Sequence, residues 1–318
     1  MRDSSRKLWR ILKVLRVVCL PFTLTACEEM GERIVVALFY REAVLPQDQV
    51  RKELSYWTGA DADPRKHRLD FYLARGKNWP VLIFAHGGSW KSGDKALEFG
   101  GVDPYGNIGR FYAARGIGVA VINYRLQSAV TWREQITDVA RALAWVYEHA
   151  PDYGGNRQAL FLFGHSSGAQ LAARAALDRN LLRELKLPPG VLRGVIAVSG
   201  APFDMTNDTS YALGTNPTRF EKRFRAGDAG DRWKIEASSV PLVTPSAPPF
   251  LLLHGRWEPK GLQRQNQLMY QALTKAGVPT RLVVAPWDGH FLIVAALSRP
   301  DSTASAAVLD FVRGAKGS

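Results

Sequence analysis

The stretch that decides the fold is "ALFLFGHSSGAQLAARAAL", residues 159–177. It starts as an apolar run typical of a buried strand, passes through small residues, and continues as an alanine-rich helical run. Residues 164–168 fit the pattern G-x-S-x-G, which on a strand-to-helix turn exposes a serine hydroxyl for nucleophilic attack. Only Ser166 has glycines two residues before and two after it, so we predict Ser166, rather than Ser167, as the nucleophile. The competing interpretation is a glycine-rich turn with solvated serines.

A serine hydroxyl needs a base to accept its proton, and the chain contains six histidines. When G-x-S-x-G lies on such a turn, an acid and then a histidine follow the serine along the chain. His290 fits this order best, because "PWDGHFLIV" is a loop-like stretch after the last apparent strand. We predict His290 as the base, and the alternative is an ordinary structural histidine.

The third member of such a site is a carboxylate that accepts the other histidine N–H and stabilises the imidazolium. We predict Glu258, which follows directly after the strand-like run "PFLLLHG". Asp288, two residues before His290, and Asp204 are the alternatives, because spacing along the chain does not fix geometry.

The reaction also needs hydrogen-bond donors aimed at the developing oxyanion. "HGGSW", residues 86–90, follows the strand-like run "WPVLIFA", and its two glycines let the backbone approach a ligand closely. We predict the N–H groups of Gly88, Ser89 and Ser167 as the oxyanion hole. The simpler interpretation of these glycines is a tight turn after a strand.

Strand-like and helical runs alternate through the rest of the chain, and the strands are uninterrupted apolar runs. This pattern predicts an α/β fold with a mostly parallel sheet covered by helices on both faces. We expect one such domain over residues 55–318. Residues 201–247 break the rhythm with polar residues and prolines, which indicates a lid or a substrate-binding insertion.

The composition excludes several classes of protein. The chain has 318 residues, 46% of them hydrophobic, which is typical of a globular protein with a well-buried core. Its formal net charge is +13, but the basic residues form no dense block with interleaved aromatics, so we expect no nucleic-acid partner. The two cysteines, Cys19 and Cys27, leave the body of the chain without a disulfide or a cysteine-based zinc site.

The N-terminus has the pattern of a targeting signal. A cationic start leads into the short apolar run "VVCLPFTLTA" and ends in "LTAC", residues 24–27, which resembles a bacterial lipoprotein signal. We therefore predict a signal peptide over residues 1–26, lipidation of Cys27, and a tether with an N-terminal extension over residues 27–54. The protein would then be lipid-anchored in the bacterial cell envelope, on the periplasmic side of the inner or outer membrane. Without a functional signal it would be cytoplasmic.

Several motifs in the body agree in order with one family. "WPVLIFAHGGSW", "RGIGVAVINYRL", "GHSSGAQLAA", "PFLLLHG" and "DGHF" together resemble α/β-hydrolase carboxylesterases with an HGGxW motif. That group includes feruloyl-esterase-like, prenylcysteine-methylesterase-like and kynurenine-formamidase-like enzymes, and the match covers roughly residues 65–315. The resemblance implies the α/β-hydrolase fold with an eight-stranded, mostly parallel sheet, and no cofactor and no metal. The family's acid is usually Asp, whereas "GRWEP" offers Glu258.

The motifs together predict a serine carboxylesterase that cleaves small carboxylic esters through an acyl-enzyme intermediate. Its partner would be a small-molecule ester, and the sequence leaves the oligomeric state open. An arylformamidase-type amide hydrolase and a non-catalytic binding protein with a hydrolase fold are the alternatives. Four tryptophans near the predicted site loops could shape an aromatic pocket, although each taken alone is more simply explained as core filling: Trp90, Trp132, Trp257 and Trp287.

Overall fold

The computed structural model describes residues 40–98, 102–127, 129–200, 202–207, 221, 224–225, 230 and 232–314. The predicted signal peptide, Cys27 and the first part of the predicted tether lie outside these residues.

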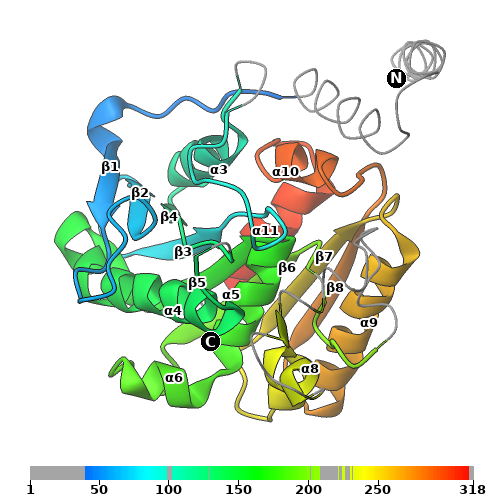
Figure 1. Cartoon of the computed structure of the whole chain (residues 1–318). Coiled ribbons are helices and arrows are strands. Elements are labelled where there is room, and N and C mark those ends of the chain that lie inside the picture. Colours follow the sequence, from blue (N-terminus) through cyan, green and yellow to red (C-terminus); the bar gives the residue numbers. More distant parts are fainter. Residues whose placement is uncertain are drawn as a thin grey trace, which may run out of the picture.

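The described residues form a sheet of eight strands in the order β1-β2-β4-β3-β5-β6-β7-β8 (Figure 1). β2 pairs antiparallel with β1 and with β4, and all other neighbours are parallel. The strands are β1 (Val50–Ser55), β2 (Arg68–Tyr72), β3 (Trp79–Ala85), β4 (Gly118–Ile122), β5 (Gly155–His165), β6 (Leu192–Val198), β7 (Phe250–Gly255) and β8 (Thr280–Ala285). The predicted eight-stranded, mostly parallel sheet is confirmed.

Helices cover both faces of this sheet, as Figure 1 shows and as the prediction required. One face packs against α4 (Trp132–His149), α5 (Ser167–Leu177), α6 (Arg179–Glu184), α8 (Arg232–Ala237) and α9 (Lys260–Lys275). The other packs against α3 (Pro104–Ala113), α10 (Leu292–Ala296) and α11 (Thr303–Gly314). Short 3₁₀ turns occupy Gln47–Gln49, Ala150–Tyr153 and Val240–Leu242.

The strand β3 explains why the central strands have uninterrupted apolar sequences. Val81 and Ile83 point into the core formed with α4 and α5, whereas Leu82 and Phe84 point into the core formed with α3. All four side chains are fully buried. A strand covered on both faces has no position left for a polar residue.

The strand β1 extends the sheet further toward the N-terminus than the sequence suggested. It begins at Val50, so the predicted boundary between tether and hydrolase domain, at residues 54 and 55, falls inside this strand. Its pairing with β2 shifts register between Arg51 and Leu54, and Glu53 has a φ of 57°. The N–H of Glu53 donates to the carboxylate of Asp70 on β2 (2.9 Å), which supports this bulge.

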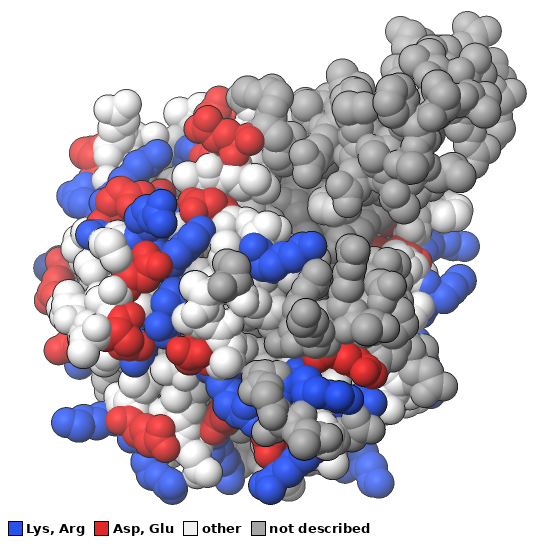
Figure 2. All heavy atoms as spheres, viewed as in Figure 1, with Lys and Arg blue, Asp and Glu red and all other residues white. Residues whose placement is uncertain are grey.

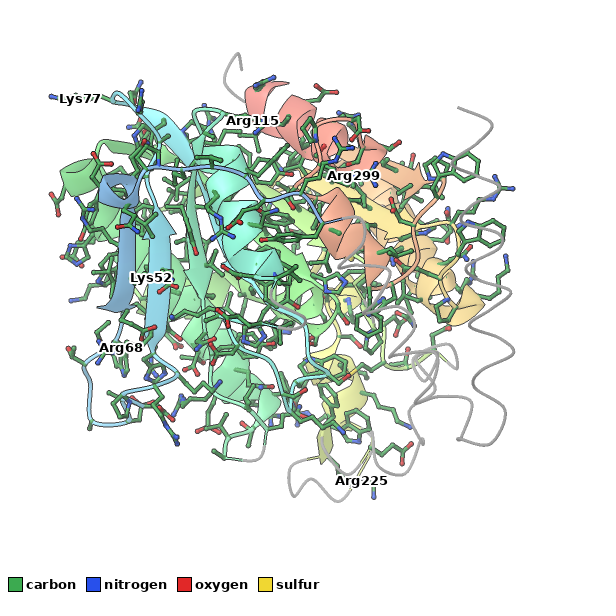
Figure 3. The ribbon with its side chains drawn as sticks, turned by 90° about the horizontal axis from the view of Figure 1, so that it is seen from above. Lys52, Arg68, Lys77, Arg115, Arg225 and Arg299 are labelled. Atoms are coloured by element: carbon green, nitrogen blue, oxygen red, sulfur yellow. The ribbon has the colours of Figure 1, made fainter. Side chains whose placement is uncertain are left out.

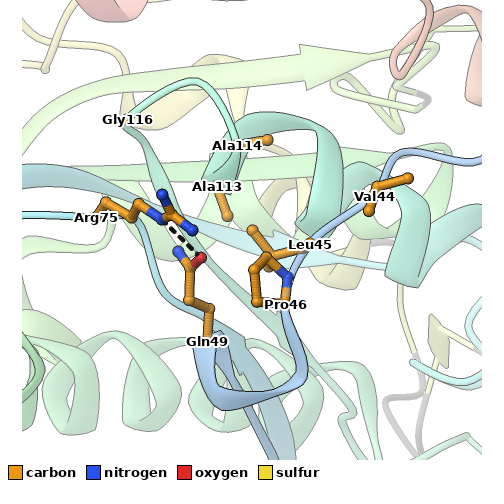
Figure 4. A pocket seen from close by; sticks show the side chains of 8 residues that line it. All are labelled: Val44, Leu45, Pro46, Gln49, Arg75, Ala113, Ala114 and Gly116. Atoms are coloured by element: carbon orange, nitrogen blue, oxygen red, sulfur yellow. Dashed lines mark hydrogen bonds between the residues drawn. The ribbon is translucent and has the colours of Figure 1, made fainter.

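A groove of about 290 Å³ lies between residues 44–49 and the end of α3 (Figure 4). Arg75 donates a hydrogen bond to Gln49 along its wall (3.3 Å). Gly116, which also lines it, precedes the first residue of β4, whereas Ser166 follows the carboxyl end of the parallel strand β5. The groove and the predicted nucleophile therefore lie at opposite ends of the strands.

The insertion predicted over residues 201–247 is described in part and contains α8. Two of its aromatic side chains, Phe224 and Trp233, are fully buried and stack with ring centroids 6.1 Å apart. The backbone carbonyl of Phe224 accepts a hydrogen bond from Trp132 Nε1 on α4 (3.0 Å). These contacts join the described part of the insertion to the helical layer that includes α4.

Charged residues of both signs are intermixed on the described part of the face shown in Figure 2. Among the helices that the structure describes, none combines the length and the apolar character needed to cross a bilayer.

Candidate active site

Ser166 lies on the turn between β5 and α5 with φ 55° and ψ −123°. A positive φ is uncommon for a residue with a side chain and stores backbone strain. Hydrogen bonds on both sides hold the turn: the Ser166 N–H donates to the Val198 carbonyl (2.9 Å), and its carbonyl accepts from the Ala169 N–H (3.0 Å). The hydroxyl is thereby fixed at the N-terminal end of α5.

The two glycines of the motif allow strand and helix to pass closely. A Cβ on Gly164 would lie 2.4 Å from the carbonyl carbon of Gly168. A Cβ on Gly168 would lie 2.2 Å from the carbonyl oxygen of Ala85 at the end of β3. Only glycine fits at either position, so the turn is a packed feature of the fold.

His290 lies in the loop between β8 and α10, and its imidazole reaches the predicted nucleophile. Its Nε2 is 3.0 Å from Ser166 Oγ, which is hydrogen-bond distance. The two residues are 124 positions apart in sequence, and the carboxyl ends of β5 and β8 bring them together. The imidazole is therefore positioned to take the hydroxyl proton.

Glu258 follows β7 and faces the other side of the same imidazole. Its Oε2 lies 3.6 Å from His290 Nδ1, which is ion-pair distance and longer than a hydrogen bond. Its Oε1 accepts hydrogen bonds from the Ser199 hydroxyl and from the Gly255 N–H (2.9 Å). Catalytic contacts are often long in a free enzyme and tighten when substrate binds.

The electrostatic setting of Glu258 favours the carboxylate form. Burial raises its pKa, but His290, the Ser199 hydroxyl and the Gly255 N–H together outweigh burial, so the pKa lies below its ordinary value. The side chain is fully buried, so a charge there needs these partners. At neutral pH the buried group is an anion that can stabilise an imidazolium.

Neither of the two alternative carboxylates, Asp204 and Asp288, lies within ion-pair distance of His290. Asp204 accepts from the N–H and hydroxyl of Thr206, two residues away. Asp288 contributes its backbone carbonyl to the Trp257 N–H (3.1 Å), and burial raises the pKa of its carboxyl. Among the described residues, Glu258 is the one carboxylate within ion-pair distance of His290.

The loop of residues 86–90 packs directly against the serine. A Cβ on Gly87 would lie 3.2 Å from Ser166 Cβ. Gly88 and Ser89 have φ values of 136° and 51°, and the Gly88 carbonyl accepts from Ser92 inside a tight turn. Within the described part of the chain, the N–H groups of Gly88, Ser89 and Ser167 donate to no acceptor. The three predicted donors therefore have no acceptor in the described part of the protein, as an oxyanion hole requires.

His86 supports this loop in a way that the sequence did not indicate. Its ring is buried and stacks on Tyr124 with centroids 4.4 Å apart, and the Tyr124 hydroxyl donates to the His86 carbonyl (2.8 Å). Burial lowers the pKa of His86 to about 4, so the ring is neutral at neutral pH. The sequence feature that could have indicated this role is the position of His86 directly before two glycines.

His165, beside the nucleophile, holds the loop that carries the base. Its Nε2 lies 2.9 Å from the backbone carbonyl of His290, so this nitrogen carries the proton and donates. Burial, and then the nearby charge of His290, lower the pKa of His165 to about 3. The ring is therefore a neutral donor that fixes the backbone of His290. His165 occupies a variable position of the G-x-S-x-G pattern, so the pattern does not indicate this contact.

A second unpredicted contact links the 86–90 loop to α5 and to the insertion. Trp90 Nε1 donates to Gln170 Oε1 (3.0 Å), and Gln170 Nε2 donates to the Ala237 carbonyl on α8 (3.1 Å). The Trp90 ring also packs edge-on against Phe224, with centroids 4.9 Å apart. Trp90 is thus part of the scaffold around the site and does not face solvent.

The described residues contain no group of three or more histidine, cysteine or carboxylate side chains that could hold a metal ion. The remaining histidines have structural contacts: His67 with Asp138, His149 with Asp152, and His254 with the carbonyl of Gly255.

Comparison with known sequences gives one family and several esterases. The BD-FAE family model matches residues 69–273, a range that includes Ser166 and Glu258 and ends before His290. Esterase LipQ of Mycobacterium tuberculosis is 33% identical over 259 residues, which cover 78% of this chain and 59% of that protein. Isoprenylcysteine alpha-carbonyl methylesterase of Arabidopsis thaliana is 33% identical over 141 residues, covering 43% of this chain and 30% of that protein. The chain thus spans about 59% of the length of the first of these relatives.

Solved structures with the same fold also carry esterase names. Esterase B from Lactobacillus rhamnosis aligns with a TM-score of 0.71 at 21% identity, covering 96% of both chains. A truncated carbohydrate esterase from gut microbiota aligns with a TM-score of 0.66 at 20% identity, covering 86% of this chain and 99% of that one. At such identities the likeness describes the fold.

Proposed function

Because the chain belongs to the BD-FAE family and has the α/β-hydrolase fold, we propose that it is a serine hydrolase that cleaves small carboxylic esters through an acyl-enzyme intermediate. The observation that carries the proposal is the 3.0 Å contact between His290 Nε2 and Ser166 Oγ. The esterase names of the relatives favour an ester bond over an amide bond as the one that is cleaved.

In this mechanism Ser166 Oγ attacks the ester carbonyl carbon while His290 Nε2 takes the hydroxyl proton. The tetrahedral oxyanion accepts hydrogen bonds from the N–H groups of Gly88, Ser89 and Ser167. Collapse breaks the bond to the alcohol, which leaves with the proton from His290. Water then repeats the sequence on the acyl-enzyme, giving the free acid and restoring Ser166.

Glu258 acts on the other side of the imidazole throughout both halves of the reaction. It favours the tautomer with the proton on Nδ1 and stabilises the imidazolium that forms when Ser166 is deprotonated. Its partners Ser199 and Gly255 keep the carboxylate ionised and directed toward His290.

The test is hydrolysis of p-nitrophenyl butyrate by the wild-type chain and by Ser166→Ala. We expect kcat to fall by about 10³-fold or more, because the nucleophile is lost. A fluorophosphonate probe should label the wild type and not the variant. Wild-type turnover in Ser166→Ala, with the probe bound elsewhere, would refute the assignment.

N-formylkynurenine, assayed beside short-chain esters, tests the amide-hydrolase alternative. We expect the larger kcat/KM for the ester, and the ratio of the two values measures the preference. A larger kcat/KM for the formamide would replace ester cleavage by arylformamide cleavage while leaving the roles of Ser166 and His290 intact.

For location, we propose that Cys27 is lipidated and anchors the chain in a bacterial cell envelope. The support is the cationic start, the apolar run and the "LTAC" motif. Palmitate labelling of the expressed chain should disappear in Cys27→Ser, and labelling that persists would contradict the proposal.

A further inference from the structure

Three large aromatic side chains are exposed on the loops that carry Glu258 and His290. Trp257, Trp287 and Phe291 have 68%, 81% and 41% of their surface accessible. Tryptophan carries a large apolar area together with one polar N–H, so exposed tryptophans gather at binding surfaces and at membrane–water interfaces. The exposure of these rings therefore needs a functional reason.

Backbone hydrogen bonds hold the two loops side by side. The Arg256 N–H donates to the Ala285 carbonyl (2.9 Å), and the Trp257 N–H donates to the Asp288 carbonyl (3.1 Å). Gln263 on α9 braces the first loop by donating to the Glu258 carbonyl (2.7 Å). The exposed rings thus sit on a fixed backbone, so their exposure is a property of the fold.

The same loops and the start of α9 carry positive charge that has no carboxylate partner among the described residues. Arg256, Lys260 and Arg264 are exposed, and no carboxylate of the described residues lies within ion-pair distance of them. Lys260 and Arg264 are four residues apart on α9 and so share one side of that helix. Within the described residues 255–275 and 286–291, the acidic residues are Glu258, which is buried, and Asp288, which is half-buried. The exposed charge of these segments is therefore positive.

We propose that these six residues (Trp257, Trp287, Phe291, Arg256, Lys260 and Arg264), which we call the aromatic–basic surface, bind an anionic lipid surface. Tryptophan and phenylalanine insert at the level of the headgroups, while arginine and lysine contact the lipid phosphates. A neutral polymer such as a polysaccharide could stack on the rings but would not use the three cations that lack a carboxylate partner. The binding does not depend on the proposed hydrolysis, although the two loops also carry Glu258 and His290.

The charge test compares vesicles of phosphatidylcholine containing phosphatidylglycerol with vesicles of phosphatidylcholine alone, using the full chain and sedimentation. At about fivefold per cation, Arg256→Gln/Lys260→Gln should weaken partition into the anionic vesicles about 25-fold. The matched control is Lys52→Gln/Lys77→Gln, which changes net charge equally at the end of the molecule formed by β1 and β2 (Figure 3). Thermal unfolding midpoints check that all variants are folded. Equal losses in both pairs would mean that net charge alone attracts the chain, and would overturn the proposal.

The insertion test uses phosphatidylglycerol vesicles with brominated acyl chains, which quench tryptophan fluorescence at the membrane. The wild type should lose a larger fraction of its fluorescence than Trp257→Phe/Trp287→Phe. Every variant keeps residues 1–39, so any membrane affinity of that segment is common to all of them. An equal quenched fraction would show that the chain binds by other residues, and the aromatic–basic surface would have no part in binding.

Two further outcomes separate this proposal from others. Binding to insoluble xylan that is lost in the tryptophan variants, with vesicle binding unchanged, would assign the surface to a carbohydrate polymer and refute lipid binding. Ser166→Ala should bind vesicles as the wild type does while losing ester hydrolysis, so failure of the proposed enzymatic function and failure of lipid binding are distinguishable.

Discussion

The two carboxylate oxygens of Glu258 have different partners. Oε1 accepts from Ser199 and Gly255, whereas Oε2 faces His290 Nδ1. In Glu258→Gln, both donors can still bind the amide oxygen, which leaves the amide NH₂ directed at His290. The amide NH₂ in Glu258→Gln would then face the Nδ1–H of His290, so two donors would point at each other. This disfavours the tautomer with the proton on Nδ1, which His290 needs in order to deprotonate Ser166 through Nε2.

Glu258→Gln should therefore lower kcat by about 10²–10⁴-fold with a small change in KM, measured with p-nitrophenyl butyrate. Asp288→Asn is the matched control, because it removes the nearest rival carboxylate, and we expect kcat within about threefold of the wild type. The opposite result, a large loss in Asp288→Asn alone, would make Asp288 the acid. Thermal unfolding midpoints of both variants check that a loss of kcat does not come from unfolding.

His165 makes stability depend on pH with a definite sign. Its pKa is about 3 in the folded chain, against about 6.5 in an unfolded chain. Below about pH 6.5 the unfolded state binds a proton that the folded state does not, so stability falls as the pH is lowered toward 3. His86, with a folded pKa of about 4, acts in the same direction.

His165→Gln should make the decline less steep, because Gln keeps an N–H donor for the His290 carbonyl and does not titrate. At pH 4.5 the titration of His165 costs the wild type roughly 2–3 kcal/mol relative to pH 7. Urea unfolding from pH 7 to 4.5 measures the difference, with His149→Gln, a change at a half-buried histidine on α4, as control. Parallel curves for the wild type and His165→Gln would contradict the buried, neutral state of this ring.

At the level of elements, the strand–turn–helix around Ser166 depends on backbones in direct contact. Gly168→Ala would place a Cβ 2.2 Å from the Ala85 carbonyl oxygen, and the rigid strand β3 cannot move away. We expect a loss of about 3 kcal/mol or more in the free energy of unfolding, together with loss of activity. Gly314→Ala, where a Cβ meets open space, should change stability by less than about 0.5 kcal/mol. Denaturant unfolding of both variants tests this, and equal stabilities would refute the packed turn.

Most of the strands that the sequence predicts are buried, and β8, "TRLVVA", is the partly exposed exception. β3, β4 and β7 are uninterrupted buried runs because both faces are covered, and the same holds for the second half of β5 and for β6 after Arg193. The chain reveals these runs directly. β1 reads "VRKELS", and its residues 50–54 fall within the predicted tether, because a polar edge strand with exposed and half-buried side chains forms no apolar run. For the same reason the count of eight strands came from the family resemblance and not from periodicity.

The candidate site was predictable where a motif fixes the backbone and unpredictable where a side chain must reach across space. The glycines around Ser166 and the order of the motifs identified the residues that the structure brings together. Three carboxylates remained open for the acid, because spacing does not say which side chain reaches His290. The contacts of His165, Ser199 and Gln170 join residues far apart in sequence, and no local pattern encodes them.

At the level of the whole molecule, Gln170 joins three segments that are distant in sequence. It accepts from Trp90 of the 86–90 loop and donates to Ala237 of the insertion, both inside the protein. A change at any of the three segments therefore reaches the other two through one buried amide.

A double-mutant cycle measures this connection. Trp90→Phe removes the donor to Gln170, and Gln170→Leu removes the acceptor together with the bond to Ala237, so each should cost about 1–3 kcal/mol of stability. Because the Trp90–Gln170 bond is lost in both single variants, the double variant should be more stable than their sum predicts by about 0.5–1.5 kcal/mol. Tyr56→Phe combined with Gln170→Leu is the control and should be additive, since these residues share no partner. Additivity in both cycles would mean that the bond contributes nothing.

The irregular start of the sheet has a consequence for how copies of this protein behave at high concentration. An outermost strand with free backbone groups is a template on which a strand of another molecule can assemble. Here the register shift and the left-handed Glu53 interrupt the regular spacing of those groups, and Arg51 and Lys52 add charge along the same rim. An incoming strand finds no straight, neutral row to join, so β1 is a poor starting point for polymerisation.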